Sequence, residues 1–252
     1  MTVQTRMKTL THHNQTFRSV PTHSKPLDSS RLEKLFQQQI DLYKSNLRSS
    51  SSEYLTALKT IPLGAHSTFQ SFDPYPISIK SAKGAWMVDV DGRKMLDLSM
   101  GFGSMLVGHL NPEVMAELKS TLDIGTLYTA PSPDSRDAAE RLCRRFGIDQ
   151  IRFTNSGTES TMYAVRTARA YTGKEGVVKV EGGYHGSGDA LLVSNKPPLD
   201  KAGPADAPIP VIGNAAVPGL SYVVPYNNVE ALEAVFQKHS DKIACFIVEP
   251  VL

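Results

Sequence analysis

The sequence lacks the features that mark several specialised classes of protein. Its two cysteines, Cys143 and Cys245, stand far apart and in no spacing typical of a metal or redox site. No apolar run is long enough for a transmembrane helix, and the amino terminus lacks the apolar core of a secretory signal. A net charge of +2 is too small to indicate nucleic-acid binding. These absences favour a cytoplasmic protein with reduced thiols and no membrane or nucleic-acid partner.

The first 28 residues also contain few large apolar residues and no acidic residue before Asp28. We interpret them as a disordered tail, with a mitochondrial presequence as the alternative because they are basic and rich in Ser and Thr. The rest has the composition of a globular protein, since 40% of the chain is hydrophobic and 21% is charged. The domains we expect are a tail (1–28), an arm with part of a small domain (29–125), and the first part of a large domain (126–252).

A helical arm is expected to open the small domain. Ser30 and Glu33 form a capping box at the start of an apolar helical face. The serine run at residues 49–52 is expected to end this helix, and a second short helix is expected at residues 53–59.

A small antiparallel sheet is expected to follow the arm. Strand-like residues at 77–79 and 86–90 precede Asp91-Gly92, which is a strong signal for a hairpin turn, and residues 94–98 form the return strand. Asn111-Pro112 then predicts the start of another helix.

Strands and helices alternate in the large domain. After a helix that starts at Ser132-Pro133, the sequence predicts a helix at 159–172 and another capped by Asn227 with Glu230. The strands are expected at residues 151–154, 177–180, 190–194, 221–224 and 243–248. Apolar strands in this alternation predict an α/β fold with a mostly parallel sheet between helices. In such sheets, ligands bind at the carboxyl ends of the strands.

Two turns at predicted strand ends have the chemistry of a binding site. Asn155-Ser156-Gly157-Thr158-Glu159 leads into a helix, so free N–H groups and the positive end of the helix dipole meet there. The second turn, Gly182-Gly183-Tyr184-His185-Gly186, carries an aromatic ring and an imidazole. A phosphate cradle beside an aromatic platform suits a flat phosphorylated cofactor.

Three stretches together resemble a known family. Asn155 to Glu159, Tyr184-His185-Gly186 and Ile247-Val248-Glu249-Pro250-Val251, in this order, resemble the class III aminotransferases among the fold-type I pyridoxal-phosphate (PLP) enzymes, closest to the glutamate-1-semialdehyde aminomutase branch. The resemblance covers roughly residues 63–252. It implies the aspartate aminotransferase-like fold, PLP as cofactor, a small amino-acid, amino-aldehyde or keto substrate, and a homodimer when the protein is complete.

The resemblance also implies roles for individual residues. Ser156, Gly157 and Thr158 would bind the PLP phosphate; the alternative is a simple helix cap. Tyr184 would stack on the pyridine ring, rather than serve only as a core aromatic residue. The family places a histidine near the cofactor at the position of His185, although a lone histidine is more often structural. Glu249, at a strand end, would anchor the structure around the cofactor.

The residues expected to meet the substrate depart from the family pattern. Ser67 keeps a hydroxyl of the aminomutase segment, but Gln70 stands where the family has an arginine that pairs with the substrate carboxylate. Glutamine cannot form a bidentate ion pair. Phe102 stands where the family has a tryptophan. We therefore expect a related enzyme whose substrate need not be glutamate-1-semialdehyde.

The resemblance places the Schiff-base lysine and the aspartate that pairs with the pyridine nitrogen downstream of the Glu-Pro-Val element. Neither is expected within these 252 residues, so the sequence predicts no catalytic residue and an amino-terminal portion of an enzyme. One alternative is a catalytically dead truncated paralogue or a binding subunit. A nucleotide-binding α/β protein is disfavoured, because the first turn is not a Gly-x-Gly-x-x-Gly fingerprint and no Walker lysine follows Gly157.

Overall fold

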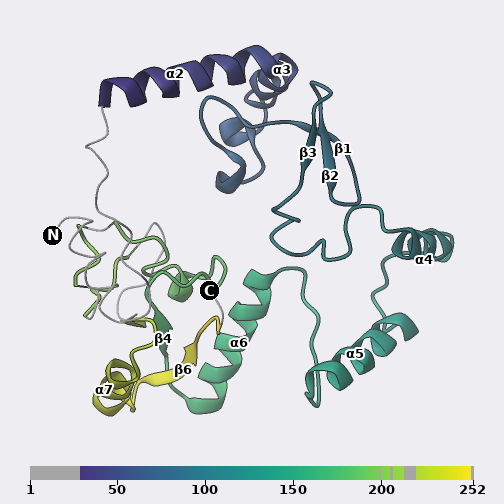
Figure 1. The fold of residues 1–252 in the computed structure, drawn as a ribbon. Helices are drawn as coiled ribbons and strands as arrows, with labels where there is room; N and C mark the ends of the chain where they lie inside the picture. Colours follow the sequence, from purple (N-terminus) through teal and green to yellow (C-terminus); the bar gives the residue numbers. More distant parts are fainter. Residues whose placement is uncertain (1–28, 199, 205–206, 213–219, 251–252) are drawn as a thin grey trace, which may run out of the picture. The chain divides into compact units, whose positions relative to one another are not determined.

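The computed structural model describes residues 29–198, 200–204, 207–212 and 220–250. The tail predicted for residues 1–28 lies outside the described residues. The described chain falls into two compact units, one that ends at Ser132 and one that begins at Pro133 (Figure 1).

The first unit opens with two helices, α2 (Ser29–Asn46) and α3 (Arg48–Ala57). The break predicted at the serine run is wrong, because those serines lie inside α3 and the helices part at the fully buried Leu47. The carboxylate of Asp91 accepts hydrogen bonds from the N–H groups of Ser49 and Ser50, at 2.7 and 3.0 Å, and from the Ser50 hydroxyl at 2.7 Å. A residue distant in sequence therefore satisfies the first N–H groups of α3.

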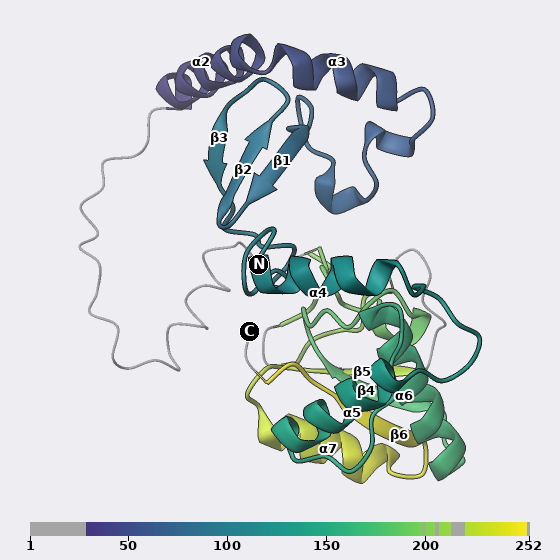
Figure 2. The same cartoon turned by 90° about the vertical axis from the view of Figure 1, so that its right-hand side faces the viewer.

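Three strands form the predicted antiparallel sheet, and Figure 2 shows them side by side. They are β1 (Ile79–Lys83), β2 (Trp86–Asp89) and β3 (Lys94–Leu96), in the order β1-β2-β3. The predicted hairpin is confirmed, and Gly92 has the positive φ of 84° that its turn requires. Two short 3-10 helices precede the sheet, η1 (Pro62–Gly64) and η2 (Thr68–Gln70). The helix α4 (Pro112–Leu122) follows it, capped by Asn111.

The second unit contains α5 (Pro133–Phe146) and the predicted parallel sheet. Its strands are β4 (Gly176–Val180), β5 (Ser221–Val224) and β6 (Ile243–Ile247), in the order β5-β4-β6. The helices α6 (Gly157–Thr172) and α7 (Val229–His239) pack against the sheet. Val177 of β4 faces the cluster that includes Val165 of α6, whereas Val178 faces the cluster that includes Leu232 of α7. The helices thus cover opposite faces of the sheet.

Two predicted strands are wrong. Residues 151–154 pair with no strand among the residues that the structure describes. Residues 190–194 instead contain part of the 3-10 helix η3 (Asp189–Leu191) and a turn, with the N–H of Leu191 donating to the Gly188 carbonyl at 2.8 Å. Three of its apolar residues, Ala190, Leu191 and Val193, are buried, but a helical turn buries them as well as a strand would.

The predicted cap of α7 is displaced by one residue. Asn228 is the N-cap, and its side-chain oxygen accepts a hydrogen bond from the N–H of Ala231 at 2.9 Å. Asn227 has a φ of 55° and turns the chain before the helix.

Candidate functional site

The start of α6 has the geometry of a capped helix with free N–H groups. Ser156 is extended, and its hydroxyl accepts a hydrogen bond from the N–H of Glu159 at 3.2 Å, while the Glu159 carboxylate accepts one from the N–H of Asn155 at 2.6 Å. The N–H groups of Gly157 and Thr158 have no carbonyl one turn earlier in the helix. A Cβ on Gly157 would meet no heavy atom within 4 Å. The helix start can therefore both cap itself and receive an anion.

The second turn, residues 182–186, packs directly on this helix start. Gly186 has a φ of 86°, and a Cβ there would lie 2.8 Å from both Cα and Oγ1 of Thr158. The Thr158 hydroxyl accepts a hydrogen bond from the N–H of Ser187 at 3.2 Å, and the Thr161 hydroxyl donates one to the His185 carbonyl at 2.8 Å. The structure thus brings the two turns together, and only glycine permits the close approach at position 186.

His185 lies at the buried side of this junction. The residue is only 8% exposed. Its Nε2 is buried and has no hydrogen-bond partner among the described residues. Burial lowers the pKa of His185, the positive charge of Lys179 lowers it further, and the negative charge of Glu249 acts in the opposite direction. The imidazole is therefore neutral at neutral pH, and its unpaired Nε2 lies close to Gly183.

Tyr184 and Glu249 are both exposed, in contrast to His185. Tyr184 is 49% exposed, so part of its side chain is accessible to a ligand. Glu249 follows β6, is exposed, and is close enough to act on the charge of His185. The residues predicted for the cofactor thus gather at the carboxyl ends of β4 and β6 and the start of α6.

Lys179 is a residue of this region to which the sequence analysis gave no role. It lies in the central strand β4, is fully buried, and donates from Nζ to the Val193 carbonyl at 2.6 Å. Burial lowers its pKa to about 8. The only signal in the sequence is a lysine within the valine run of β4.

The residues predicted for the substrate lie in the other unit. Ser67 immediately precedes η2, and Gln70 is its last residue. The ring of Phe69, within η2, meets the ring of Phe102 edge-on, with 6.0 Å between the ring centroids. Phe102 has a φ of 56° and is 83% exposed. Within this unit, the structure therefore brings the segments of Ser67, Gln70 and Phe102 together.

The loop that carries Phe102, residues 99–108, is fixed at its base by Asp97. Its carboxylate accepts hydrogen bonds from the N–H groups of Ser99 and Met100, at 3.0 and 2.8 Å, and contacts Nε2 of His109 at 2.7 Å. The hydrogen bond from His109 and those from the backbone lower the pKa of Asp97. The Asp97 carboxylate that holds the base of the loop is therefore ionised at neutral pH.

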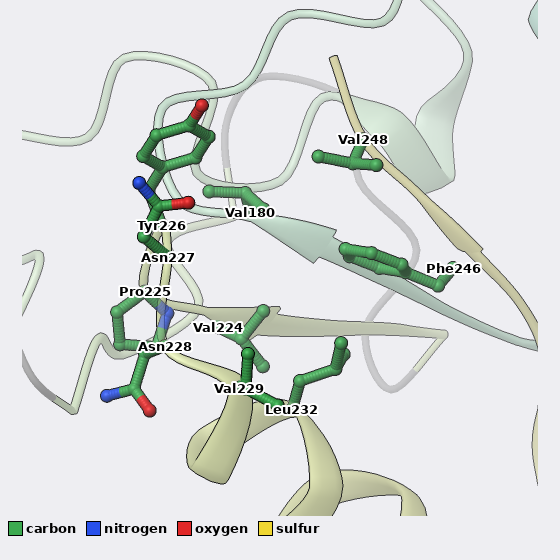
Figure 3. Close-up of a pocket in the computed structure, with 10 residues that line it drawn as sticks. All are labelled: Val180, Val224, Pro225, Tyr226, Asn227, Asn228, Val229, Leu232, Phe246 and Val248. Carbon is green, nitrogen blue, oxygen red and sulfur yellow. The ribbon is translucent and has the colours of Figure 1, made fainter. Parts of the chain in front are cut away.

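An apolar hollow of about 180 Å³ lies at the carboxyl ends of the strands, on the α7 face of the sheet (Figure 3). Val180, Phe246 and Val248 form part of its wall, and none of the residues that line it is charged. It does not suit a phosphate group, and it lies on the face opposite α6. No group of three or more metal-ligating side chains occurs in the described part of the chain. Across the same residues, no helix combines the length and apolar character needed to cross a bilayer.

Comparison with known proteins decides the family. Residues 69–252 match the family described as Aminotransferase class-III, which is more than half of the chain. The chain belongs to the class III aminotransferase family. The resemblance inferred from the three motifs is thereby confirmed.

Relatives and solved structures of this family agree with the fold. Glutamate-1-semialdehyde 2,1-aminomutase of Methanothrix thermoacetophila is 39% identical over 212 residues, 82% of this chain and 47% of that protein. The glutamate-1-semialdehyde-aminomutase structure from Pseudomonas aeruginosa PAO1 has a TM-score of 0.78 at 26% identity, over 90% of this chain and 49% of that one. A transaminase with PLP bound has a TM-score of 0.72 at 32% identity, over 81% of this chain and 48% of that one. The predicted fold is confirmed, and the chain spans about half the length of these class III relatives.

Proposed function

We propose that the complete protein is a PLP-dependent aminotransferase or aminomutase and that this chain supplies its phosphate cradle and ring platform. The observation that carries the proposal is the junction of two turns: Gly186 packs on Thr158 at the start of α6, so the turn that carries the exposed Tyr184 lies against a helix start. A helix start of this kind can bind a phosphate, and an aromatic side chain can stack on a pyridine ring.

In this proposal each residue acts through binding or orientation. The N–H groups of Gly157 and Thr158 and the hydroxyls of Ser156 and Thr158 bind the phosphate dianion. Tyr184 would stack on the ring. His185 would lie near the ring in its neutral form, so that no unpaired cation would be buried there. When bound, PLP supplies an electron sink that makes proton loss from the amine-bearing carbon feasible.

The fit of the cofactor is supported by two features of the chain. There is open space beside Gly157, where a phosphate could approach. Gly186 of the second turn, in contrast, packs tightly against Thr158. The buried Nε2 of His185 also has no partner among the described residues, which is costly unless a ligand or water satisfies it. We expect the covalent lysine and the aspartate partner of the pyridine nitrogen outside these 252 residues.

For the complete protein we propose a small amino or keto substrate, a homodimer, and a cytoplasmic location. The named aminomutases among the relatives support this substrate class. Gln70, in place of the arginine expected from the resemblance, makes glutamate-1-semialdehyde a less suitable substrate. Cys143 and Cys245 are both free thiols, in keeping with a reducing compartment.

The test is a titration of the purified chain with PLP, followed by visible absorbance, with pyridoxal as the matched ligand that lacks the phosphate. We expect saturable PLP binding and much weaker pyridoxal binding, because the helix start binds the phosphate. Borohydride trapping followed by mass analysis should modify no lysine stoichiometrically. Equal affinity for the two ligands would overturn the phosphate cradle, and a lysine trapped within this chain would overturn the assignment of the anchor to residues outside it.

A further inference from the structure

A buried lysine in the middle of a parallel sheet needs a physical reason. Lys179 is fully buried, and its ammonium group donates to the carbonyl of Val193 at 2.6 Å. Burying a charged amine is costly unless other groups compensate for the lost water. A methionine would fill similar space without burying a charge. We therefore expect the amine of Lys179 to stabilise the structure or to act on the site.

The amine is connected to the 182–186 turn through the backbone. Val193, whose carbonyl it holds, is followed by the buried Ser194. The Ser194 carbonyl accepts a hydrogen bond from the N–H of Gly182 at 2.8 Å, and its N–H donates to the Val211 carbonyl at 2.9 Å. The first residue of the turn therefore rests on the segment that Lys179 anchors.

The amine is also connected to the turn through charge. Among the residues that the structure describes, it is one of two charged groups that act on His185, and the other is Glu249 after β6. On α6, Thr158 packs on Gly186 and Thr161 donates to the His185 carbonyl, and neither carries a charge. A positive charge held near a buried imidazole opposes its protonation.

We propose that Lys179 is a positioning residue for His185: its ammonium group fixes the base of the 182–186 turn through Val193 and places a positive charge near the buried imidazole. The inference rests on the proposed function, because a neutral imidazole matters to catalysis only if the cofactor ring lies against this turn. Lys179 has no covalent role in this arrangement, since it is buried beneath the turn and already bonded to a carbonyl.

The test measures the pKa of His185 by NMR in the purified chain, labelled at its histidine rings and without PLP, with His185→Gln to assign the signal. In Lys179→Met, we expect the pKa of His185 to rise by about one unit, because a positive charge near the imidazole has been removed. Lys179→Arg keeps the charge and should leave the pKa low. Glu249→Gln should lower it.

The matched control is Lys174→Met. Lys174 also donates from Nζ to a backbone carbonyl, that of Ser240, at 2.6 Å. It lies before β4 and is not among the groups that act on His185. Its loss should leave the His185 titration unchanged. A folded Lys179→Met chain in which His185 keeps its original pKa would overturn the proposal, because a merely structural lysine would give that result.

A second measurement covers the case in which Lys179→Met does not fold. In the unmodified chain, the ring signals of His185 should shift again as the pH passes about 8, with the same midpoint as the Lys179 amine. Absence of this second shift would also overturn the proposal.

The same samples are then titrated with PLP. If the His185 titration depends on Lys179 but PLP does not bind, the electrostatic link stands and the proposed function fails. If PLP binds but the titration of His185 is independent of Lys179, the proposed function stands and the positioning role fails.

Discussion

The 182–186 turn and the 99–108 loop are both rich in glycine and both carry predicted site residues, yet they are held in different ways. The turn is packed against Thr158 and Thr161 of α6 and anchored from below through Lys179. The loop is tied at its base by Asp97, and its Phe102 is 83% exposed. The side predicted for the cofactor is therefore packed against a helix within its own unit. On the side predicted for the substrate, the loop is held at its two ends, by Asp97 and by the pairing of His109 with Gly84, and Phe102 is exposed between them.

Because the two sides are held in different ways, they should respond differently to substitution. Changes at the turn should disturb both folding and cofactor binding, because the same contacts serve both. Changes at the tip of the loop should leave the stability of the chain almost unchanged, because an exposed side chain contributes little to folding.

The largest effect is expected for Gly186→Ala. The new Cβ would lie 2.8 Å from Cα of Thr158 in a backbone with a φ of 86°, so strain and overlap should together cost about 3 kcal/mol. Urea unfolding measures this loss, and PLP affinity should fall with it. Gly182→Ala is the control, since its φ is also positive but its Cβ would meet nothing within 4 Å, and it should cost about 1 kcal/mol. Equal losses for the two variants would contradict the close packing of the turn on α6.

A smaller effect is expected for Ser156→Ala. Loss of the hydroxyl that accepts from the Glu159 N–H should destabilise the chain by about 1 kcal/mol and weaken PLP binding. Ser156→Asp separates the two roles, because aspartate also caps helices but its charge repels a phosphate. We expect near-normal unfolding and at least tenfold weaker PLP binding for this variant. Unchanged PLP affinity in Ser156→Asp would mean that Ser156 is only a cap.

The start of α6 and the three parallel strands could be predicted because their signals are local. Ser156 and Glu159 stand at the spacing of a cap, and valine runs bounded by turn residues predict β4 and β5. The wrong prediction of a strand at residues 190–194 shows the limit of reasoning from local signals. Apolar composition predicts burial, but it does not tell which backbone conformation achieves it.

Contacts between residues distant in sequence could not be predicted. The sequence indicated that serines would end a helix, yet the carboxylate of Asp91 caps α3 inside that serine run. Lys179 is a similar case, because nothing next to it identifies Val193 as its partner. The site residues themselves were found from a family resemblance and a pair of turns, whereas the groups that hold them in place appear only in three dimensions.

The cap provided by Asp91 predicts a pH dependence in the first unit. Desolvation acts to raise the pKa of Asp91, but hydrogen bonds from Ser50 and Ser49 outweigh it and lower the pKa to about 2. A pKa that is lower in the folded state contributes stability above the unfolded value of about 4, and that stability is lost as the pH falls from about 4 to about 2. Because the carboxylate is solvent-screened, the effect should be smaller than that of Ser156→Ala.

Circular dichroism between pH 5 and pH 2 measures this loss as a decrease in helical signal. Asp91→Asn should remove the acid-dependent step. In this variant, α3 should be slightly less stable than in the original chain already at pH 5. Asp41→Asn is the control, because Asp41 accepts a hydrogen bond from Gln37 within α2 and does not cap α3. An acid transition that is the same in the original chain and in Asp91→Asn would assign the step to another carboxylate.

The smallest effect is expected for Phe102→Ala, at the tip of the loop. Phe102 is largely exposed and meets Phe69 edge-on, so the free energy of unfolding should change by less than about 0.5 kcal/mol. PLP affinity should also stay unchanged, because the residues proposed to bind the cofactor all lie between residues 156 and 249. Urea unfolding and the PLP titration measure both quantities in the same variant. A loss of PLP affinity as large as that of Gly186→Ala would break the distinction between a cofactor side packed against a helix and a separately held substrate side, since it would make the loop part of the cradle.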